Sequence, residues 1–369
     1  MLLIKGGDLY SPKHVGIRDL LISQGVEKIG THLDMDCEVI DAEGKLVTPG
    51  LIDRHIHVIG GGGEGGFLTQ SSRVEPLDLI QGGLTSVVGL LGTDGITRNV
   101  DNLVAYAKAL KEYGFSVYCM TGSYGYPPVT LTGSVGKDIV FIDEILGCKL
   151  ALSDHRSSHI SYDELLRLAS EVRTAGMIGK KVGCLTLHMG DEPYGLDQVF
   201  EILKKTSVPV KTFQPTHISR NEKLFEQACE FAKQGGTIDL TCDDPERTAQ
   251  ALEKAMERKV PWDKITISSD GQGSWSQYDK AGNLIKIGTS PVDSIYKQIK
   301  YLCQKKSMEF EKALALGTIN VATALELYPK KGSLKEHSDA DLLIWNRDLS
   351  LDTVIAKGKV LMRSGSPVE

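Results

Sequence analysis

Several classes of protein are excluded by features that this chain lacks. Basic residues are not in excess, since 42 Lys and Arg stand against 48 Asp and Glu, and no segment is dense in Lys or Arg. A nucleic-acid partner is therefore not expected. No stretch approaches the ~20 apolar residues of a membrane span, and residues 1–7 lack a basic region followed by a long apolar one. We expect no membrane segment, and we expect small molecules as partners.

The chain also lacks paired cysteines. Its seven cysteines are an odd number and include no C-x-x-C pair. Such usage is typical of buried thiols in a reducing compartment. The cysteine pattern therefore predicts a cytoplasmic protein.

Short apolar, β-rich runs recur about every 25–35 residues, which is roughly the length of one strand and one helix. Eight such runs are present, at residues 51–58, 85–90, 116–121, 149–153, 184–188, 210–214, 237–241 and 265–268. Helical patterns lie between them. Ser161 and Glu164 form a capping box before an apolar stripe that Gly176 is expected to end, and residues 221–234 repeat the pattern. The alternation predicts a (β/α)8 TIM barrel over residues 49–329.

The two ends of the chain do not follow that alternation. Short strand-like runs separated by Gly and polar turns occur at 19–23 and 37–41, and again at 341–345 and 354–361. Residues 1–48 and 330–369 are therefore predicted to pair into one small β-sandwich domain beside the barrel.

His55 and His57 are separated by one residue at the end of the first barrel run. Residues i and i+2 of a strand point to the same face, so both imidazoles can reach one metal ion. Polar candidates accompany other runs in the same way: Lys149, His188, His217 and Asp270. Chemistry in a barrel lies at the carboxyl ends of the strands, so five strands are predicted to contribute to one rim. Lys149 fits least well, because it opens its run and reaches the rim only through its long side chain.

The segment Pro-Gly-Leu-Ile-Asp-Arg-His-Ile-His at 49–57, with the Lys, His, His and Asp that follow, resembles the amidohydrolase superfamily. Segments 60–64, 86–94, 153–157 and 268–274 resemble its isoaspartyl dipeptidase branch, and the similarity runs through nearly the whole chain. The resemblance implies hydrolysis of the isopeptide bond of β-aspartyl dipeptides through a hydroxide shared by two metal ions. It also implies a homo-oligomer, with an octamer as one form.

The resemblance assigns one divalent ion to His55, His57 and Asp270, and a second to His188 and His217. Imidazole and carboxylate ligands suit zinc, although Fe, Mn and Co also remain open.

Lys149 cannot be a ligand unmodified, because a free lysine is a cation at neutral pH. The resemblance implies that it reacts with CO2 to give a carbamate whose two oxygens bridge the metals. Asp270 would also take a proton from the hydroxide and deliver it to the leaving nitrogen. Tyr124 resembles the family tyrosine that hydrogen-bonds the developing oxyanion, with Tyr126 as a nearby alternative.

Charged residues around this centre match a substrate with two carboxylates and one amine. Arg156 and Arg220 can each bind a carboxylate, and Glu64 can receive an ammonium group. A β-aspartyl dipeptide carries those three charges. The resemblance also implies supporting hydrogen-bond groups at Gly62, Thr93 and Ser274. The remaining histidines are assigned no role in the site: His14, His32, His155, His159 and His337.

Two alternatives come from other functional classes. A cyclic-amide hydrolase, such as a dihydroorotase or hydantoinase, shares the metal site, but its substrate carries no free α-amine for Glu64 to bind. A non-catalytic assembly protein on the same fold would have lost ligands, and here every expected ligand is present.

Overall fold

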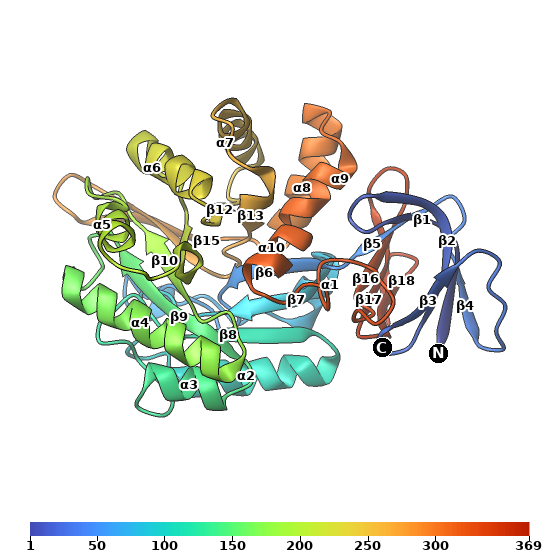
Figure 1. Ribbon diagram of the computed structural model, residues 1–369, viewed down its shortest axis with the longest axis horizontal. Coiled ribbons are helices and arrows are strands. Elements are labelled where there is room, and N and C mark those ends of the chain that lie inside the picture. The colour runs from blue at the N-terminus through green and yellow to red at the C-terminus, as the bar shows by residue number, and fades with distance from the viewer. Residues whose placement is uncertain (369) are drawn as a thin grey trace.

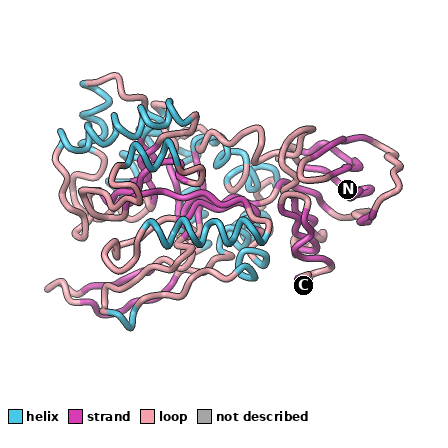
Figure 2. The backbone as a smooth tube through the Cα atoms, turned by 90° about the horizontal axis from the view of Figure 1, so that it is seen from below, coloured by secondary structure: helices cyan, strands magenta, loops and turns pink. Residues whose placement is uncertain are grey.

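The computed structural model describes residues 1–368. A sheet built from both ends of the chain stands to one side of a larger α/β body, and the two termini lie close together there (Figures 1 and 2). Residue 369, the end of the predicted terminal domain, lies outside the described range. Among the described residues, no helix is long and apolar enough to cross a membrane.

The terminal sheet has nine strands. They are β1 (Leu2–Tyr10), β2 (His14–Ile22), β3 (Val26–Gly30), β4 (Glu38–Asp41), β5 (Leu46–Pro49), β16 (Leu342–Trp345), β17 (Leu351–Ala356), β18 (Lys359–Arg363) and β19 (Ser366–Pro367). Antiparallel pairing of β5 with β16 joins the two ends of the chain. Hydrogen bonds make these strands one continuous sheet, so the sandwich form stays a prediction. The run predicted at 354–361 is a hairpin of β17 and β18 that turns at Lys357 and Gly358.

Eight parallel strands form the larger body. They are β6 (Leu51–Ile56), β7 (Leu84–Gly89), β8 (Ser116–Gly122), β9 (Ile145–Leu152), β10 (Cys184–Met189), β11 (Phe213–Thr216), β12 (Ile238–Thr241) and β13 (Ile265–Ser268). The first six pair in chain order, and β12 pairs with β13. The last strand returns to the first, because the Asp270 amide donates to the His55 carbonyl at 3.0 Å and Ile56 bridges to Gly271. This curled parallel sheet is consistent with the predicted barrel.

Two predicted strand starts are wrong. Strand β9 begins four residues before Lys149, so that residue lies inside the strand and is fully buried, not at its opening. The β-branched residue Val210 begins a short 3-10 turn (Val210–Thr212), and β11 starts only at Phe213.

Helices follow most of the strands. They are α1 (Pro76–Gln81), α2 (Val100–Tyr113), α3 (Val135–Phe141), α4 (Tyr162–Gly179), α5 (Asp197–Lys205), α6 (Glu222–Lys233), α7 (Pro245–Glu257), α8 (Ser294–Lys306), α9 (Phe310–Leu316) and α10 (Ile319–Ala324). Ser161 and Glu164 form the predicted capping box. Gly176 does not end α4, which continues to Gly179 and is capped by Lys180 at φ +52°. Gly176 instead allows close packing, since a Cβ there would lie 2.5 Å from the Gly183 Cα.

The hairpin that follows β13 was not predicted. After β13 the chain forms an antiparallel hairpin, β14 (Ser274–Tyr278) and β15 (Leu284–Thr289), before α8 begins. Its strands are only partly buried, so their sequence lacks the apolar run that identified the barrel strands. The hairpin starts directly after the Asp270 loop and therefore lies beside the strand ends.

Trp345 connects the terminal sheet to helices α8 and α9 of the larger body. Its side chain is fully buried, its indole nitrogen donates to Thr48 Oγ1 at 2.8 Å, and its ring packs near Tyr296 of α8 and Phe310 of α9. A large side chain at such a junction stabilises both parts at once.

We predict that Trp345→Ala lowers the free energy of unfolding by about 3–5 kcal/mol, the usual cost of truncating a buried tryptophan. Urea denaturation followed by circular dichroism measures it. Phe67→Ala is the matched control, because Phe67 is 82% exposed and should change stability by at most about 0.5 kcal/mol. Equal small effects for both variants would contradict the role given to Trp345.

Candidate active site

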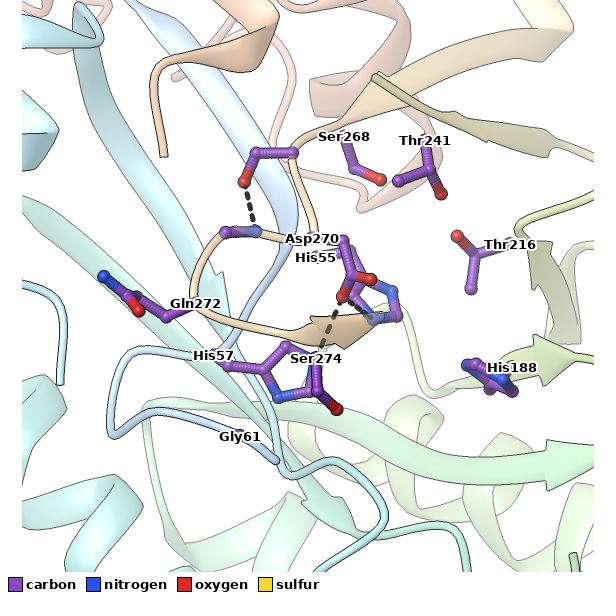
Figure 3. A network of polar contacts seen from close by, with 12 residues as sticks. His55, His57, Gly61, His188, Thr216, Thr241, Ser268, Asp270, Gln272 and Ser274 are labelled. Carbon is purple, nitrogen blue, oxygen red and sulfur yellow. Dashed lines mark hydrogen bonds and ion pairs between the residues drawn. The ribbon is translucent and has the colours of Figure 1, made fainter. Parts of the chain in front are cut away.

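His55, His57 and Asp270 meet where the first and last strands of the curled parallel sheet, β6 and β13, come together. The Asp270 Oδ1 atom lies 3.5 Å from His55 Nε2 and 3.1 Å from His57 Nε2 (Figure 3). Both histidines are buried. Burial acts to raise the pKa of Asp270, but the His57 hydrogen bond and the neighbouring His217, His57 and Lys149 side chains outweigh it and bring the pKa to about 2. The carboxylate is therefore anionic and available to a cation.

Lys149 lies against this group from the interior of β9. Its amine is 2.9 Å from His55 Nε2, and its side chain is fully buried. Burial lowers the pKa of Lys149 to about 7, despite the opposing effect of Asp270 and Asp239. A large part of the amine is thus neutral near pH 7, and a neutral amine is the nucleophile that adds to CO2.

His188 and His217 lie on the other side of the cluster. Their ring centroids are 4.5 Å apart, and the His217 ring is 4.9 Å from that of His55. His217 Nδ1 is 2.6 Å from Thr241 Oγ1, which fixes the ring and leaves Nε2 facing the cluster. Burial lowers the pKa of both histidines well below the usual value, so both rings are neutral, as metal ligands must be.

The donor set fits a divalent cation. Three imidazole nitrogens are buried without a hydrogen-bond partner among the described residues: His55 Nδ1, His57 Nδ1 and His217 Nε2. One ligand atom each from His55, His217 and Asp270 lie within 4.8 Å of one another. Buried polar atoms usually have partners, and neutral imidazoles with a carboxylate are ligands that zinc and similar ions prefer.

The loops hold two of these residues in unusual backbone conformations. His217 has φ +59° and Asp270 has φ +53°, both in the left-handed region that favours glycine. Each such residue costs of order 1–3 kcal/mol and persists only where its surroundings impose it. The strain turns both side chains toward the cluster.

Asp53 supports this arrangement and was not identified from the sequence. It is fully buried, and its carboxylate accepts from the His55 amide at 3.1 Å and from the Ser269 amide at 3.3 Å. It therefore ties the backbone of a histidine to the residue before Asp270. Burial raises the pKa of Asp53 to about 7. Its position in a buried strand was the available signal, since an ionisable side chain there needs partners.

Glu64 lies in the glycine-rich loop after β6, and its predicted companions surround it. Its carboxylate accepts from Ser274 Oγ at 2.8 Å, Thr93 Oγ1 at 3.1 Å and Arg156 Nη1 at 3.3 Å. Gly62 lies in the same loop at φ +80° and bridges to Gln70. The structure thus brings together residues from four separate loops.

Arg156 does not project freely. Its guanidinium forks onto Asp154, with both N–O distances at 2.9 Å, and it also contacts Glu64. Asp154 in turn lies 3.1 Å from His188 Nε2. These contacts hold the pKa of Asp154 well below its usual range, although burial alone would raise it. Asp154 was missed because an aspartate two residues before an arginine is common in surface loops and does not indicate a functional site.

Arg220 is more loosely held. Its nearest carboxylate is Asp191, at 4.0 Å, and one Nη atom is 3.4 Å from His188 Nε2. It lines a cavity of about 270 Å³ that opens over the cluster. The cavity is lined by Arg156, Asp191, His217, Ser219, Arg220, Thr241, Asp243, Arg247, Asp270, Ser274, Trp275, Ser276 and Ser290.

The geometry favours Tyr124 over Tyr126 as the tyrosine of the site. The Tyr124 hydroxyl is 2.7 Å from His188 Nδ1, and its side chain is buried beneath the Arg156 guanidinium. Burial raises the pKa of Tyr124, so it keeps its proton to donate. Tyr126 is only partly buried and lines a separate depression beside α4.

Histidines assigned no role have other contacts. His159 pairs with Glu192 at 2.9 Å, and His14 pairs with Asp8 at 2.6 Å. His155 packs edge-on against Tyr278 of the hairpin.

The chain is similar to several known proteins of one family. Residues 149–361 and 38–87 match two models of the amidohydrolase family. Beta-aspartyl dipeptidase of Fervidobacterium islandicum AW-1, solved in complex with β-Asp-Leu, is 41% identical, with a TM-score of 0.96 over 100% of this chain and 98% of that one. Imidazolonepropionase of Pseudomonas fluorescens (strain Pf0-1) is 26% identical over 85% of this chain and 82% of its own.

A more distant structure shares the fold alone. Dihydropyrimidinase of Brevibacillus agri NCHU1002 is 16% identical, with a TM-score of 0.66 over 99% of this chain and 96% of that one. The family models cover more than half of the sequence, including the histidine pair, Lys149 and the other residues of the cluster. This chain belongs to the amidohydrolase family.

Proposed function

We propose that this protein is a metal-dependent dipeptidase that hydrolyses the isopeptide bond of β-aspartyl dipeptides. The observation that carries the proposal is the position of Glu64, an anion joined to Thr93, Ser274 and Arg156 beside the histidine cluster. A free amine on the substrate calls for such an anion. The similarity to a dipeptidase solved with β-Asp-Leu supports the same substrate class.

His55, His57 and Asp270 would hold one ion, His188 and His217 the other, and Lys149 would bridge them as a carbamate. Two bound divalent ions would supply Lewis acidity and a water of lowered pKa. Zinc is the ion that we propose for both positions, because the donors are imidazoles and carboxylates.

The side chains of the chain itself would move the proton and hold the substrate. Asp270, with its pKa near 2, starts as an anion and would accept a proton and pass it to the leaving nitrogen. The Tyr124 hydroxyl, which remains protonated, would donate to the carbonyl oxygen as negative charge develops there. Arg220 would bind one substrate carboxylate, Arg156 the other, and Glu64 the ammonium group.

We further propose a homo-oligomer, with an octamer as the form suggested by resemblance, in the cytoplasm. We also propose that residues 1–48 and 330–369 form a β-sandwich domain beside a barrel of residues 49–329. The single hydrogen-bonded sheet that both ends share supports this division.

A cyclic-amide hydrolase is the alternative that uses the same metal site. Comparing the hydrolysis of β-Asp-Leu with that of dihydroorotate and hydantoin discriminates the two. We expect turnover of the dipeptide and none of the cyclic amides, because the latter leave Glu64 without an ammonium partner. Turnover of the cyclic amides alone would refute the proposed function.

Lys149→Ala should remove activity and most of the bound metal, because alanine leaves a void between two cations. A small carboxylic acid should restore part of both, since its two oxygens have nearly the spread of a carbamate. Metal analysis and the rate with and without added acid measure this. A variant that keeps both metals and full turnover would exclude the bridging role.

Glu64→Gln should reduce kcat/KM for β-Asp-Leu at least about tenfold, which corresponds to roughly 1.4 kcal/mol and is typical of a lost charge-assisted hydrogen bond. N-acetylation of the substrate should harm the unmodified enzyme to a similar degree. The two losses should not add when variant and acetylated substrate are combined. Equal rates with free and acetylated dipeptide would remove the recognition role from Glu64.

Arg98 should act on the substrate through the loop that carries Glu64. Its Nη2 donates to the Ser71 carbonyl at 2.9 Å and approaches that of Gly61 at 3.5 Å, and Nη1 donates to the Ile59 carbonyl. Nothing in the sequence distinguished it, because it binds backbone oxygens far along the chain.

We predict that Arg98→Gln raises KM for β-Asp-Leu several-fold and changes kcat less, because the loop is displaced while the histidine cluster is kept. Steady-state kinetics measure the two parameters. Arg73 is the control, because it is exposed and pairs with Glu75 on the surface. Arg73→Gln should change neither KM nor kcat. Full additivity of Arg98→Gln with Glu64→Gln would show that Arg98 does not act through Glu64.

A further inference from the structure

The cavity extends beyond the groups that the proposed aspartyl half of the substrate needs. Glu64 and Thr93 lie in the loops after β6 and β7, on one side of the rim. Arg247, Asp243 and Trp275 line the cavity from the α7 segment and the hairpin. With the aspartyl amine at Glu64, the residue released by hydrolysis would extend toward these three.

Arg247 has donors to spare. Its Nη2 donates to the Ser219 carbonyl at 3.1 Å, but its nearest carboxylate, Asp243, is 3.7 Å away, beyond hydrogen-bond distance. The side chain is about half exposed. Arg156, by contrast, already donates to two carboxylates, Asp154 and Glu64. A guanidinium that lines a cavity and whose paired carboxylate lies beyond hydrogen-bond distance favours a ligand that brings its own oxygens.

Trp275 supplies the other part of this subsite. Its ring packs on Gly288 of the hairpin. Trp275 is 43% exposed and lines the cavity. An indole face of this kind packs against the methylene groups of a side chain. The Lys286 amine lies 5.1 Å from the centroid of the same ring. The subsite thus combines an indole wall with a cationic end.

We propose that Arg247 and Trp275 form the subsite for the side chain of the released residue, and that Arg247 selects side chains ending in a carboxylate or amide oxygen. This inference rests on the proposed function. The Asp243 carboxylate lies beside the same guanidinium and repels an acidic side chain of the substrate. Asp243 therefore sets how strongly a Glu side chain is preferred over a Gln side chain.

The test compares kcat/KM for β-Asp-Gly, β-Asp-Leu, β-Asp-Gln and β-Asp-Glu in the unmodified enzyme and in variants. Unmodified enzyme should prefer Glu and Gln over Leu. Arg247→Gln should reduce the Glu-to-Leu ratio at least about fivefold, or roughly 1 kcal/mol. Arg247→Lys should retain part of the preference, and Asp243→Asn should increase it. Arg167→Gln, an exposed change on α4, should leave all four values unchanged.

Two results would overturn the inference. An unchanged Glu-to-Leu ratio in Arg247→Gln would mean that Arg247 does not contact the side chain. An equal loss for all four dipeptides, β-Asp-Gly included, would place Arg247 on the main-chain carboxylate instead. If the unmodified enzyme cleaved none of the four dipeptides, the proposed function itself would be refuted. That outcome is distinct from the two results above.

Discussion

The centre of this molecule depends on how a buried lysine amine is accommodated among imidazoles. Lys149 is fully buried inside β9, and its nearest polar contact is His55, not a carboxylate. A charged ammonium is costly in such a place, which is why burial lowers the pKa of Lys149 to about 7. A cationic amine would also repel metal ions at this position. Conversion of Lys149 to an anion would remove that repulsion and attract the cations that the unpartnered histidine nitrogens can bind.

The remainder of the fold holds side chains from distant segments at that point. Hydrogen bonding between the first and last strands of the curled sheet places Asp270 beside the histidine pair, and Asp53 fixes both backbones. The strained backbone conformations at His217 and Asp270 destabilise the fold locally. They persist because the packed residues around them impose these conformations. Glu64 and Arg156 lie on longer loops around the cluster and share one ion pair at 3.3 Å.

The sequence was sufficient where a pattern is local. Eight apolar runs predicted the eight parallel strands, and the capping box at Ser161 marked the start of α4. Prediction from the sequence failed where a contact between residues far apart in the chain determines the structure. Gly176 does not stop a helix because it packs on Gly183, and Arg98 binds carbonyls that only the folded chain brings near. Asp154 was missed for the same reason, since its partner His188 lies on another strand.

The most direct test of the account is a crystal structure of the metal-loaded protein with anomalous diffraction at the metal edge. The account predicts two anomalous peaks about 3.5–4 Å apart, the usual separation in two-metal sites. Planar density should extend from the Lys149 amine to both. A single peak, or two peaks with an unmodified lysine side chain between them, would contradict the claim that Lys149 completes a binuclear centre.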